Sequence, residues 1–208
     1  MTALVQLEGV AAALPQANIN TDIIAPLVRG GSGAQPVGLR PAEELAQRLF
    51  GPWRYDASGR ENPRFVLNRG PFRQARFLIA GPNFACGSSR ETAATMLHAF
   101  GIRCVIAPSF GQIFHDNCLR NHMLPLQLPQ EVVNQLISQA ESGHPFHLDL
   151  RAMSLQPPQG DSIGFTLPLF RHEMLLQGLD EVAVTLARSA QIDAYQAASR
   201  AARPWEWL

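Results

Sequence analysis

The chain has 208 residues, 46% of them hydrophobic, and its 17 basic and 17 acidic residues give a formal net charge of zero. This composition is typical of a globular protein rather than a disordered one, and the length fits one domain of ordinary size. A balanced charge without a dense basic stripe argues against nucleic acid or an anionic membrane surface as a partner.

Every basic residue is arginine, because the sequence contains no lysine. A Schiff base, a pyridoxal-phosphate site and a Walker A phosphate loop all require a lysine, so these three kinds of site are excluded. No apolar run approaches the ~20 residues that span a bilayer, and the first residues lack the basic region of a secretory signal. We therefore expect a cytoplasmic protein that does not contact membranes.

The three cysteines, Cys86, Cys104 and Cys118, lie far apart in the sequence. No pair has the spacing of a zinc site, and an odd number suggests free thiols. We expect this chain to bind no metal or cofactor by itself, although three thiols gathered in space remain the alternative. Cys86 and Cys118 are interpreted as small buried hydrophobes.

The first third of the chain contains one clear strand and a long irregular region. Residues 5–14 are predicted to form the strand, and the polar cluster at 18–22 forms a turn before a short apolar segment. Asp22, taken alone, is a turn residue, because Asp side chains bond their own backbone in such turns. Residues 29–75 have little periodicity apart from a helix at 41–50, which indicates a functional loop or disorder. Their glycine-rich piece at 30–33 is a candidate for a mobile lid.

A strand, a loop and a helix follow in a pattern typical of a βαβ unit. Residues 77–80 are an apolar run, apolar residues recur at helical spacing from 93 to 100, and 104–107 form the next strand. The loop at 81–91 is rich in small residues and precedes the helix. Backbone N–H groups converge at such a point and the helix dipole favours negative charge, so we expect an anionic ligand there.

The remaining elements are predicted from the same periodicities, and no second domain boundary is evident, so residues 1–208 are expected to form a single domain. Ser109 is the expected N-cap of a helix at 109–121, and the histidines at 98, 115 and 122 are interpreted as surface or satisfied core residues. The other expected elements are strands at 123–128, 146–150 and 162–167 and helices at 131–142, 170–177 and about 180–200.

The residues at the loop allow a structural and a functional interpretation. Ser88 and Glu91 have the spacing of a capping box, which by itself requires no ligand. That spacing does not explain Ser89 or Arg90. A cation in the first helical turn opposes the dipole by ~0.3–1 kcal/mol unless an anion is bound there, and Gly87 lets the backbone approach a ligand closely.

These residues resemble a known family, the small subunit of 3-isopropylmalate dehydratase, which is related to the swivelling domain of aconitase. The resemblance covers most of the chain in the right order. Its segments are residues 83–91 (NFACGSSRE), 105–110 (VIAPSF), Ile113-Phe114, Asn117, Leu124-Pro125, 20–24 (NTDII), 65–68 (FVLN) and 178–180 (GLD).

The resemblance implies an α/β fold, the swivelling β/β/α domain of this family, and a subunit that works only with a large subunit. That partner, joined in a heterodimer or heterotetramer, carries a [4Fe–4S] cluster whose free iron acts as a Lewis acid on the leaving hydroxyl of a small dicarboxylate. The activity implied is a hydro-lyase of leucine biosynthesis, which interconverts 2-isopropylmalate and 3-isopropylmalate by dehydration and rehydration.

The resemblance also implies roles for individual residues. Ser88 is the base that removes a proton from the carbon beside a carboxylate, Ser89 binds substrate, and Arg90 clamps a carboxylate with its planar fork of donors. A serine becomes basic only where its alkoxide is stabilised, as a helix N-terminus beside a guanidinium does. Thr21 and Asp22 match a loop that lines the family's active site, so we expect both to bind substrate.

Two departures from the family pattern leave alternatives open. Thr92 stands where the family usually has histidine, and residues 27–31 (LVRGG) replace a region that commonly holds a lysine and an aromatic residue and helps to set the substrate's side chain. A paralogous hydro-lyase acting on citramalate, dimethylmalate or homoaconitate is therefore an alternative. A non-catalytic anion-binding module that kept the loop but lost its partner is another.

Overall fold

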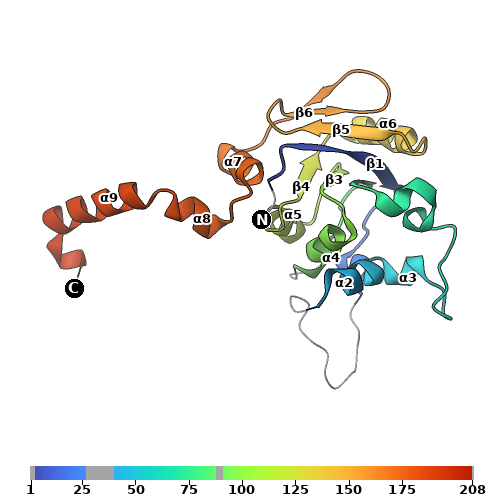
Figure 1. Ribbon diagram of the computed structural model, residues 1–208, viewed down its shortest axis with the longest axis horizontal. Helices are drawn as coiled ribbons and strands as arrows, with labels where there is room; N and C mark the ends of the chain where they lie inside the picture. The colour runs from blue at the N-terminus through green and yellow to red at the C-terminus, as the bar shows by residue number, and fades with distance from the viewer. Residues whose placement is uncertain (1–2, 27–39, 88–90, 208) are drawn as a thin grey trace.

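The computed structural model describes residues 3–26, 40–87 and 91–207. Their strands form one seven-stranded sheet in the order β4-β3-β2-β1-β5-β6-β7, with β1 to β4 parallel and the other three antiparallel to their neighbours (Figure 1). The strands are β1 (Gln6–Leu14), β2 (Phe77–Ala80), β3 (Cys104–Ala107), β4 (Leu124–Gln127), β5 (Pro145–Asp149), β6 (Ser154–Gln156) and β7 (Ile163–Gly164).

The parallel part of the sheet is buried on both faces. All four residues of β2 and all four of β3 are buried, which is why these strands are continuous apolar runs without alternation. Leu78 and Val105 pack into one core, whereas Phe77 and Cys104 pack into the other, on the opposite face. Both apolar runs were predicted as strands, and both predictions are confirmed.

Helices cover both faces of the sheet. The first core takes buried residues from α1 (Thr21–Ile24), α2 (Ala42–Arg48), α4 (Thr92–Phe100) and α5 (Gln112–Arg120). The second core takes them from α6 (Gln130–Ala140) and α7 (Leu169–Gln177). Figure 1 shows α2 and α4 on the opposite side of the sheet from α6. Gly101 ends α4 and Gly178 ends α7, both in the left-handed region, as predicted.

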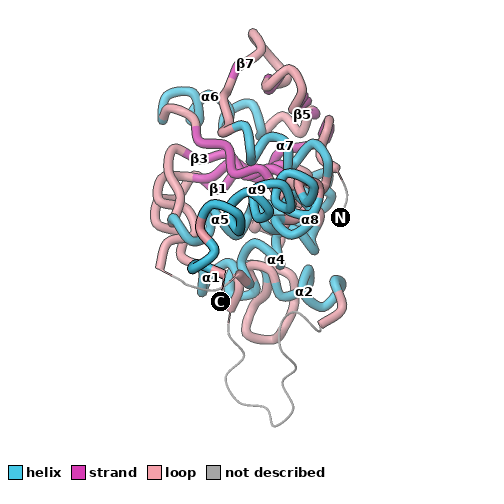
Figure 2. The backbone as a smooth tube through the Cα atoms, turned by 90° about the vertical axis from the view of Figure 1, so that its left-hand side faces the viewer, coloured by secondary structure: helices cyan, strands magenta, loops and turns pink. Residues whose placement is uncertain are grey.

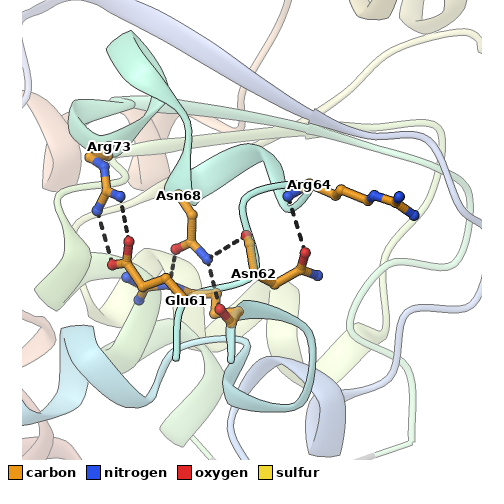
Figure 3. A network of polar contacts seen from close by, with 6 residues as sticks. Glu61, Asn62, Arg64, Asn68 and Arg73 are labelled. Atoms are coloured by element: carbon orange, nitrogen blue, oxygen red, sulfur yellow. Dashed lines mark hydrogen bonds and ion pairs between the residues drawn. The ribbon is translucent and has the colours of Figure 1, made fainter. Parts of the chain in front are cut away.

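The region predicted to be irregular contains short helices held by a buried arginine. It holds α3 (Gly51–Arg54) and the 3₁₀ helices η2 (Val66–Asn68) and η3 (Gly70–Gln74). Arg54 is 7% exposed, and its Nε donates to Asn68 Oδ1 at 3.1 Å while Nη1 donates to Ala46 O at 2.6 Å. Asn68 in turn donates to the carbonyl oxygens of Arg54 and Asn62 at 2.7 and 3.0 Å (Figure 3). The candidate lid at 30–33 lies outside the described residues.

Two predicted elements differ from the observed ones, and one observed strand was not predicted. The expected long helix at 180–200 is two helices, α8 (Glu181–Leu186) and α9 (Ser189–Ala202), followed by η4 (Pro204–Glu206). The expected strand at 162–167 shrinks to β7, and β6 was not predicted at all. Two- and three-residue strands carry too few alternating positions to give a periodic signal.

His122 differs from its interpretation as a surface or satisfied core residue. Its side chain is 3% exposed, and neither ring nitrogen has a hydrogen-bond partner among the described residues. Burial, followed by the charges of the N-terminal amine and Arg103, lowers the pKa of His122. The ring is therefore kept neutral inside the fold. Among the described residues, no helix is both long and apolar enough to cross a bilayer.

Candidate functional site

The candidate site is the edge of the sheet where three consecutive parallel strands end. The loops after β1, β2 and β3 are bonded to one another there through their backbones. Ala85 N donates to Ile19 O at 2.7 Å, and Thr21 N donates to Cys86 O at 3.1 Å. On the other side, Phe84 N donates to Ser109 O at 3.0 Å. The middle loop, which contains the predicted anion-binding segment, is therefore fixed by its neighbours up to Cys86.

Side chains add a second set of bonds to the same loop. Asn83 N donates to Ser109 Oγ at 2.8 Å, and Asn83 Nδ2 donates to Asn18 Oδ1 at 2.7 Å. Ser109 was predicted to cap the following helix, but α5 begins at Gln112 with Gly111 as its N-cap. Ser109 does not cap the helix because its hydroxyl accepts the hydrogen bond from Asn83 in the neighbouring loop.

The backbone of the middle loop is strained. Asn83 and Ala85 have φ angles of +55° and +57°, and Asn18 in the adjacent loop has +59°. Residues other than glycine seldom adopt this region, and it costs of order 1–3 kcal/mol when the surrounding structure imposes it. Such strain is concentrated where a protein must hold backbone groups in one orientation.

Two glycines let the three loops approach closely. A Cβ atom on Gly81 would lie 2.4 Å from Gln16 O, and one on Gly111 would lie 2.5 Å from Ala85 O. Both contacts are with backbone atoms, which cannot rotate away as a flexible side chain could. Any larger residue at either position would therefore push the middle loop away from its neighbours.

Thr21 and Asp22 lie beside this loop. They begin α1, whose N-cap Asn20 accepts a hydrogen bond from Ile23 N at 3.0 Å through its side chain. Thr21 is 6% exposed and is bonded to Cys86 through its backbone, whereas Asp22 is exposed in the first turn. Asp22 can therefore be a turn residue and still be accessible to a ligand.

Ser88, Ser89 and Arg90 lie outside the described residues, so their predicted roles rest on the segments that flank them. Before them, Gly87 has a φ of +84° and follows the bonded part of the loop. After them, Glu91 Oε1 accepts a hydrogen bond from Asn121 Nδ2 at 2.7 Å.

The predicted capping box pairs Glu91 with Ser88, which lies outside the described residues. In a capping box Glu91 would be the third residue of the helix, but it is the N-cap of α4 and makes no side-chain capping bond. Its carboxylate is held instead by Asn121 at the end of α5. The sequence separation of 30 residues explains why a local pattern could not reveal this bond.

The electrostatics of the edge favour an anion. The nine-residue helix α5 begins at this edge, where Gly111 N donates to Phe84 O at 2.9 Å, and its unpaired N–H groups and dipole place partial positive charge there. Chemically, the arrangement can bind a carboxylate and stabilise an alkoxide on a nearby serine.

The chain's own thiols do not fit an iron–sulfur site. Cys104 and Cys118 are completely buried, and burial raises the pKa of both thiols, which keeps them protonated. Cys86 is half-buried at the candidate site, so its interpretation as a buried hydrophobe is only partly right. In the part of the chain that the structure describes, no three Cys, His, Asp or Glu residues are grouped to hold a metal ion.

Comparison with known proteins gives a consistent result. The model of the "Aconitase C-terminal domain" family matches residues 1–131. A 3-isopropylmalate dehydratase small subunit of Dinoroseobacter shibae is 44% identical over 99% of this chain and 100% of its own length. Another from Rhodospirillum centenum is 45% identical over 96% of each chain, and one from Rhizobium meliloti is 42% identical over 99% of this chain and 100% of its own.

Among solved structures, a 3-isopropylmalate dehydratase from Methanocaldococcus jannaschii resembles this chain with a TM-score of 0.61. The alignment covers 92% of this chain and 99% of that one at 23% identity, so this likeness concerns the fold. Together with the family match, it confirms the predicted aconitase-type swivelling domain.

Proposed function

This chain belongs to the family of 3-isopropylmalate dehydratase small subunits, and we propose that it serves as that subunit in a hydro-lyase of leucine biosynthesis. The reaction is the interconversion of 2-isopropylmalate and 3-isopropylmalate by loss and readdition of water. The observation that carries the proposal is the start of the segment 83–91, which is bonded at the carboxyl edge of the parallel strands beside Thr21 and Asp22.

The proposal includes a large subunit. The relatives are named small subunits, and the chemistry of this chain's edge is incomplete, since it offers anion binding and hydroxyl groups but no metal site among the described residues. A large subunit carrying a [4Fe–4S] cluster supplies the missing part, in a heterodimer or heterotetramer. The thiols of this chain do not suit the cluster, so the cluster is assigned to the large subunit.

Ser88 is the proposed catalytic base. In the sequence Ser88 comes three residues before Glu91, the N-cap of α4, and the positive end of a helix is the kind of group that stabilises an alkoxide. It removes the proton from the substrate carbon that bears a carboxylate, and it returns a proton to carbon when water is added back in the other direction. Microscopic reversibility requires the group that removes a given proton to return it in the reverse step, so Ser88 acts as the acid when the same malate is formed again.

The other site residues position the dicarboxylate. Arg90 pairs with one carboxylate through two parallel N–H donors, which fixes its plane as well as its charge. Ser89, Thr21 and Asp22 bind the substrate from the two adjoining loops. The bonds from Asn83 to Ser109 and Asn18 fix the start of this segment, which reduces the entropy lost on reaching the reactive geometry.

Two sequence features favour a second candidate, a hydro-lyase subunit that acts on another 2-alkylmalate or on homoaconitate. Thr92, the first residue of α4, stands where the family usually has histidine, and residues 27–31 depart from the usual composition of the family. In the family the region at 27–31 helps to set the substrate's side chain, whereas the dehydration chemistry rests on the segment 83–91. A non-catalytic anion-binding module is the candidate from another class.

An anaerobic assay of the reconstituted pair decides among these candidates. The purified chain is combined with its large subunit and offered 2-isopropylmalate, citramalate, dimethylmalate and homoaconitate at equal concentration. We expect the highest kcat/KM for 2-isopropylmalate and no turnover by either subunit alone. A higher kcat/KM for another substrate would replace the proposed one, and a pair that forms but turns over none of them would indicate the non-catalytic module.

A further inference from the structure

The C-terminal arm, residues 180–207, is the part of the chain that packs least on the domain. It comprises α8, α9 and η4. It leaves the domain after α7 and extends away from the sheet (Figure 1), so that it lies in front of the domain in the view of Figure 2. Apart from Glu181, whose side chain is not described, Ser199 is the only buried residue of the arm. The arm therefore contributes almost nothing to the two cores.

The arm nevertheless carries large apolar side chains. Val182 and Leu186, which are 66% and 65% exposed, are four residues apart on α8 and so share one face. At the far end, Tyr195 and Trp205 are 64% and 67% exposed. Tryptophan and tyrosine are the residue types most enriched at the energetic centres of protein interfaces, whereas a free arm would lose solubility by exposing them.

The tip of the arm has a defined shape without a partner. Arg203 Nη2 donates to Tyr195 OH at 3.3 Å and to Ser199 Oγ at 3.2 Å, and Trp207 Nε1 donates to the same Ser199 Oγ at 3.2 Å. The Arg200 guanidinium lies 4.7 Å from the centre of the Trp207 ring. Because these bonds fold η4 back on α9, less conformational entropy is lost when the tip binds.

We propose that the C-terminal arm is a clamp that holds the large subunit, with Val182, Leu186 and Trp205 in the contact. This inference rests on the proposed function, since it needs that partner. Small subunits are matched over their whole length and 99% of this chain, so they share the arm, whereas the aconitase-type domain match ends at residue 131. The arm thus belongs to the small subunit rather than to the catalytic domain that it has in common with aconitase.

The position and size of the arm fit a large partner. Leu4 N donates to Leu175 O at 2.8 Å, so the arm begins near the start of β1, at the opposite edge of the sheet from the candidate site. With 1.5 Å per residue, the two helices extend about 30 Å. A partner that contacts both the site and the arm therefore encloses the domain. The arm would bury on the order of 500 Å² of accessible surface, and a stable interface typically buries ~800 Å² on each partner.

A second copy of this chain is a poorer fit. Outside the arm, the large hydrophobic residues exposed on the described part of the chain are Ile113, Leu169 and Phe170. Three side chains offer too small a receiving surface for the apolar residues of α8 and the tip together. Exchange of arms between two copies of this chain would overturn the proposal.

The test uses the full chain with two variants, Val182→Ser/Leu186→Ser and Trp205→Ala. The matched control is Gln191→Ala, which changes an exposed polar residue of α9. Each is titrated anaerobically with the large subunit to obtain Kd, and kcat is measured at saturating large subunit. We expect Kd to rise at least tenfold for each variant and about a hundredfold or more when they are combined, with the control unchanged. The kcat at saturation is expected to stay native, because the arm begins at the edge opposite the site.

Two results would overturn the clamp. One is a native Kd for both variants in chains whose thermal unfolding matches that of the control. The other is self-association of the native chain that the variants abolish, with binding to the large subunit unaffected. If the native pair is active but the variants bind normally, the clamp alone fails. If the variants weaken a pair that turns over no malate, the proposed function alone fails.

Discussion

Replacing Gly111 by alanine tests whether the close approach of two loops sets the catalytic geometry. The new Cβ would lie 2.5 Å from Ala85 O and 3.1 Å from Ala85 C, whereas carbon atoms essentially never approach backbone atoms within 3.0 Å. The loop that leads to Ser88 must then move by at least ~0.5 Å, and the true displacement is larger because ordinary contacts lie beyond 3.4 Å. Overpacking of this kind costs about 1–3 kcal/mol.

The catalytic effect is expected to exceed the effect on stability. A misplacement of ~1 Å can lower a rate by about a hundredfold, because the base no longer meets the proton it removes. We therefore expect kcat of the reconstituted enzyme to fall by about ten- to a hundredfold in Gly111→Ala, with Tm lower by several degrees.

The matched control is Gly164→Ala. A Cβ on Gly164 would meet nothing within 4 Å, and Gly164 has ordinary negative-φ backbone. Its kcat and Tm are expected to stay close to native. The reasoning is refuted if Gly111→Ala and Gly164→Ala have the same kcat with the same Kd for the large subunit.

Three further predictions follow from other contacts. Ser109→Ala removes the acceptor of Asn83 N, so we expect kcat to fall about tenfold at unchanged Kd for the large subunit; an unchanged kcat contradicts the role given to this bond. Burial, then the charge of a neighbouring arginine, lowers the pKa of His98 to about 4, so the unfolded chain binds the extra proton and stability is lost as the pH falls from about 6.5 towards 4. His98→Gln is expected to flatten that decline in denaturant titrations at several pH values, and an equally steep decline would exclude His98 as its source. Asn68→Leu leaves Arg54 Nε without its acceptor, so we expect the free energy of unfolding to fall by about 2–4 kcal/mol. A fall of less than about 1 kcal/mol would show that this hydrogen bond does not stabilise the fold.

The parts of the fold that could be predicted are those with a local signal. The apolar runs at 77–80 and 104–107 gave the central strands, because a strand buried on both faces has no polar positions. Gly101 and Gly178 gave helix ends, since only glycine readily adopts the left-handed cap. The three-residue strand β6 gave no periodic pattern, and the alternation at 162–167 predicted a longer strand than the two residues of β7. The break between α8 and α9 lies in an alanine-rich sequence that favours helix throughout.

The candidate site was located by its motif, but the contacts that support it were not. Asn83 meets Asn18, which is 65 residues away, and Glu91 meets Asn121, which is 30 residues away. Hydrogen bonds between loops depend on which strands are neighbours, and that order is a property of the whole sheet. Local rules therefore assigned Ser109 and Glu91 to helix caps, the commonest local use of such residues.

The close packing at Gly81 and Gly111 had only a weak signal in the sequence. Each glycine stands beside a loop, where flexibility is the usual interpretation, yet both are needed because backbone atoms of another loop occupy the space of a side chain. Gly81 follows β2 immediately, which is a position where glycine often allows such an approach.

Exchange of the substrate's proton with solvent tests the central claim most directly. The reconstituted enzyme is incubated with 2-isopropylmalate in D₂O, and deuterium incorporation at the carbon beside the carboxylate is followed by NMR for the native chain and for Ser88→Ala. We predict rapid incorporation by the native enzyme and a loss of at least a thousandfold in Ser88→Ala, with the Kd for the large subunit unchanged. Incorporation at the native rate in Ser88→Ala would contradict the assignment of Ser88 as the base.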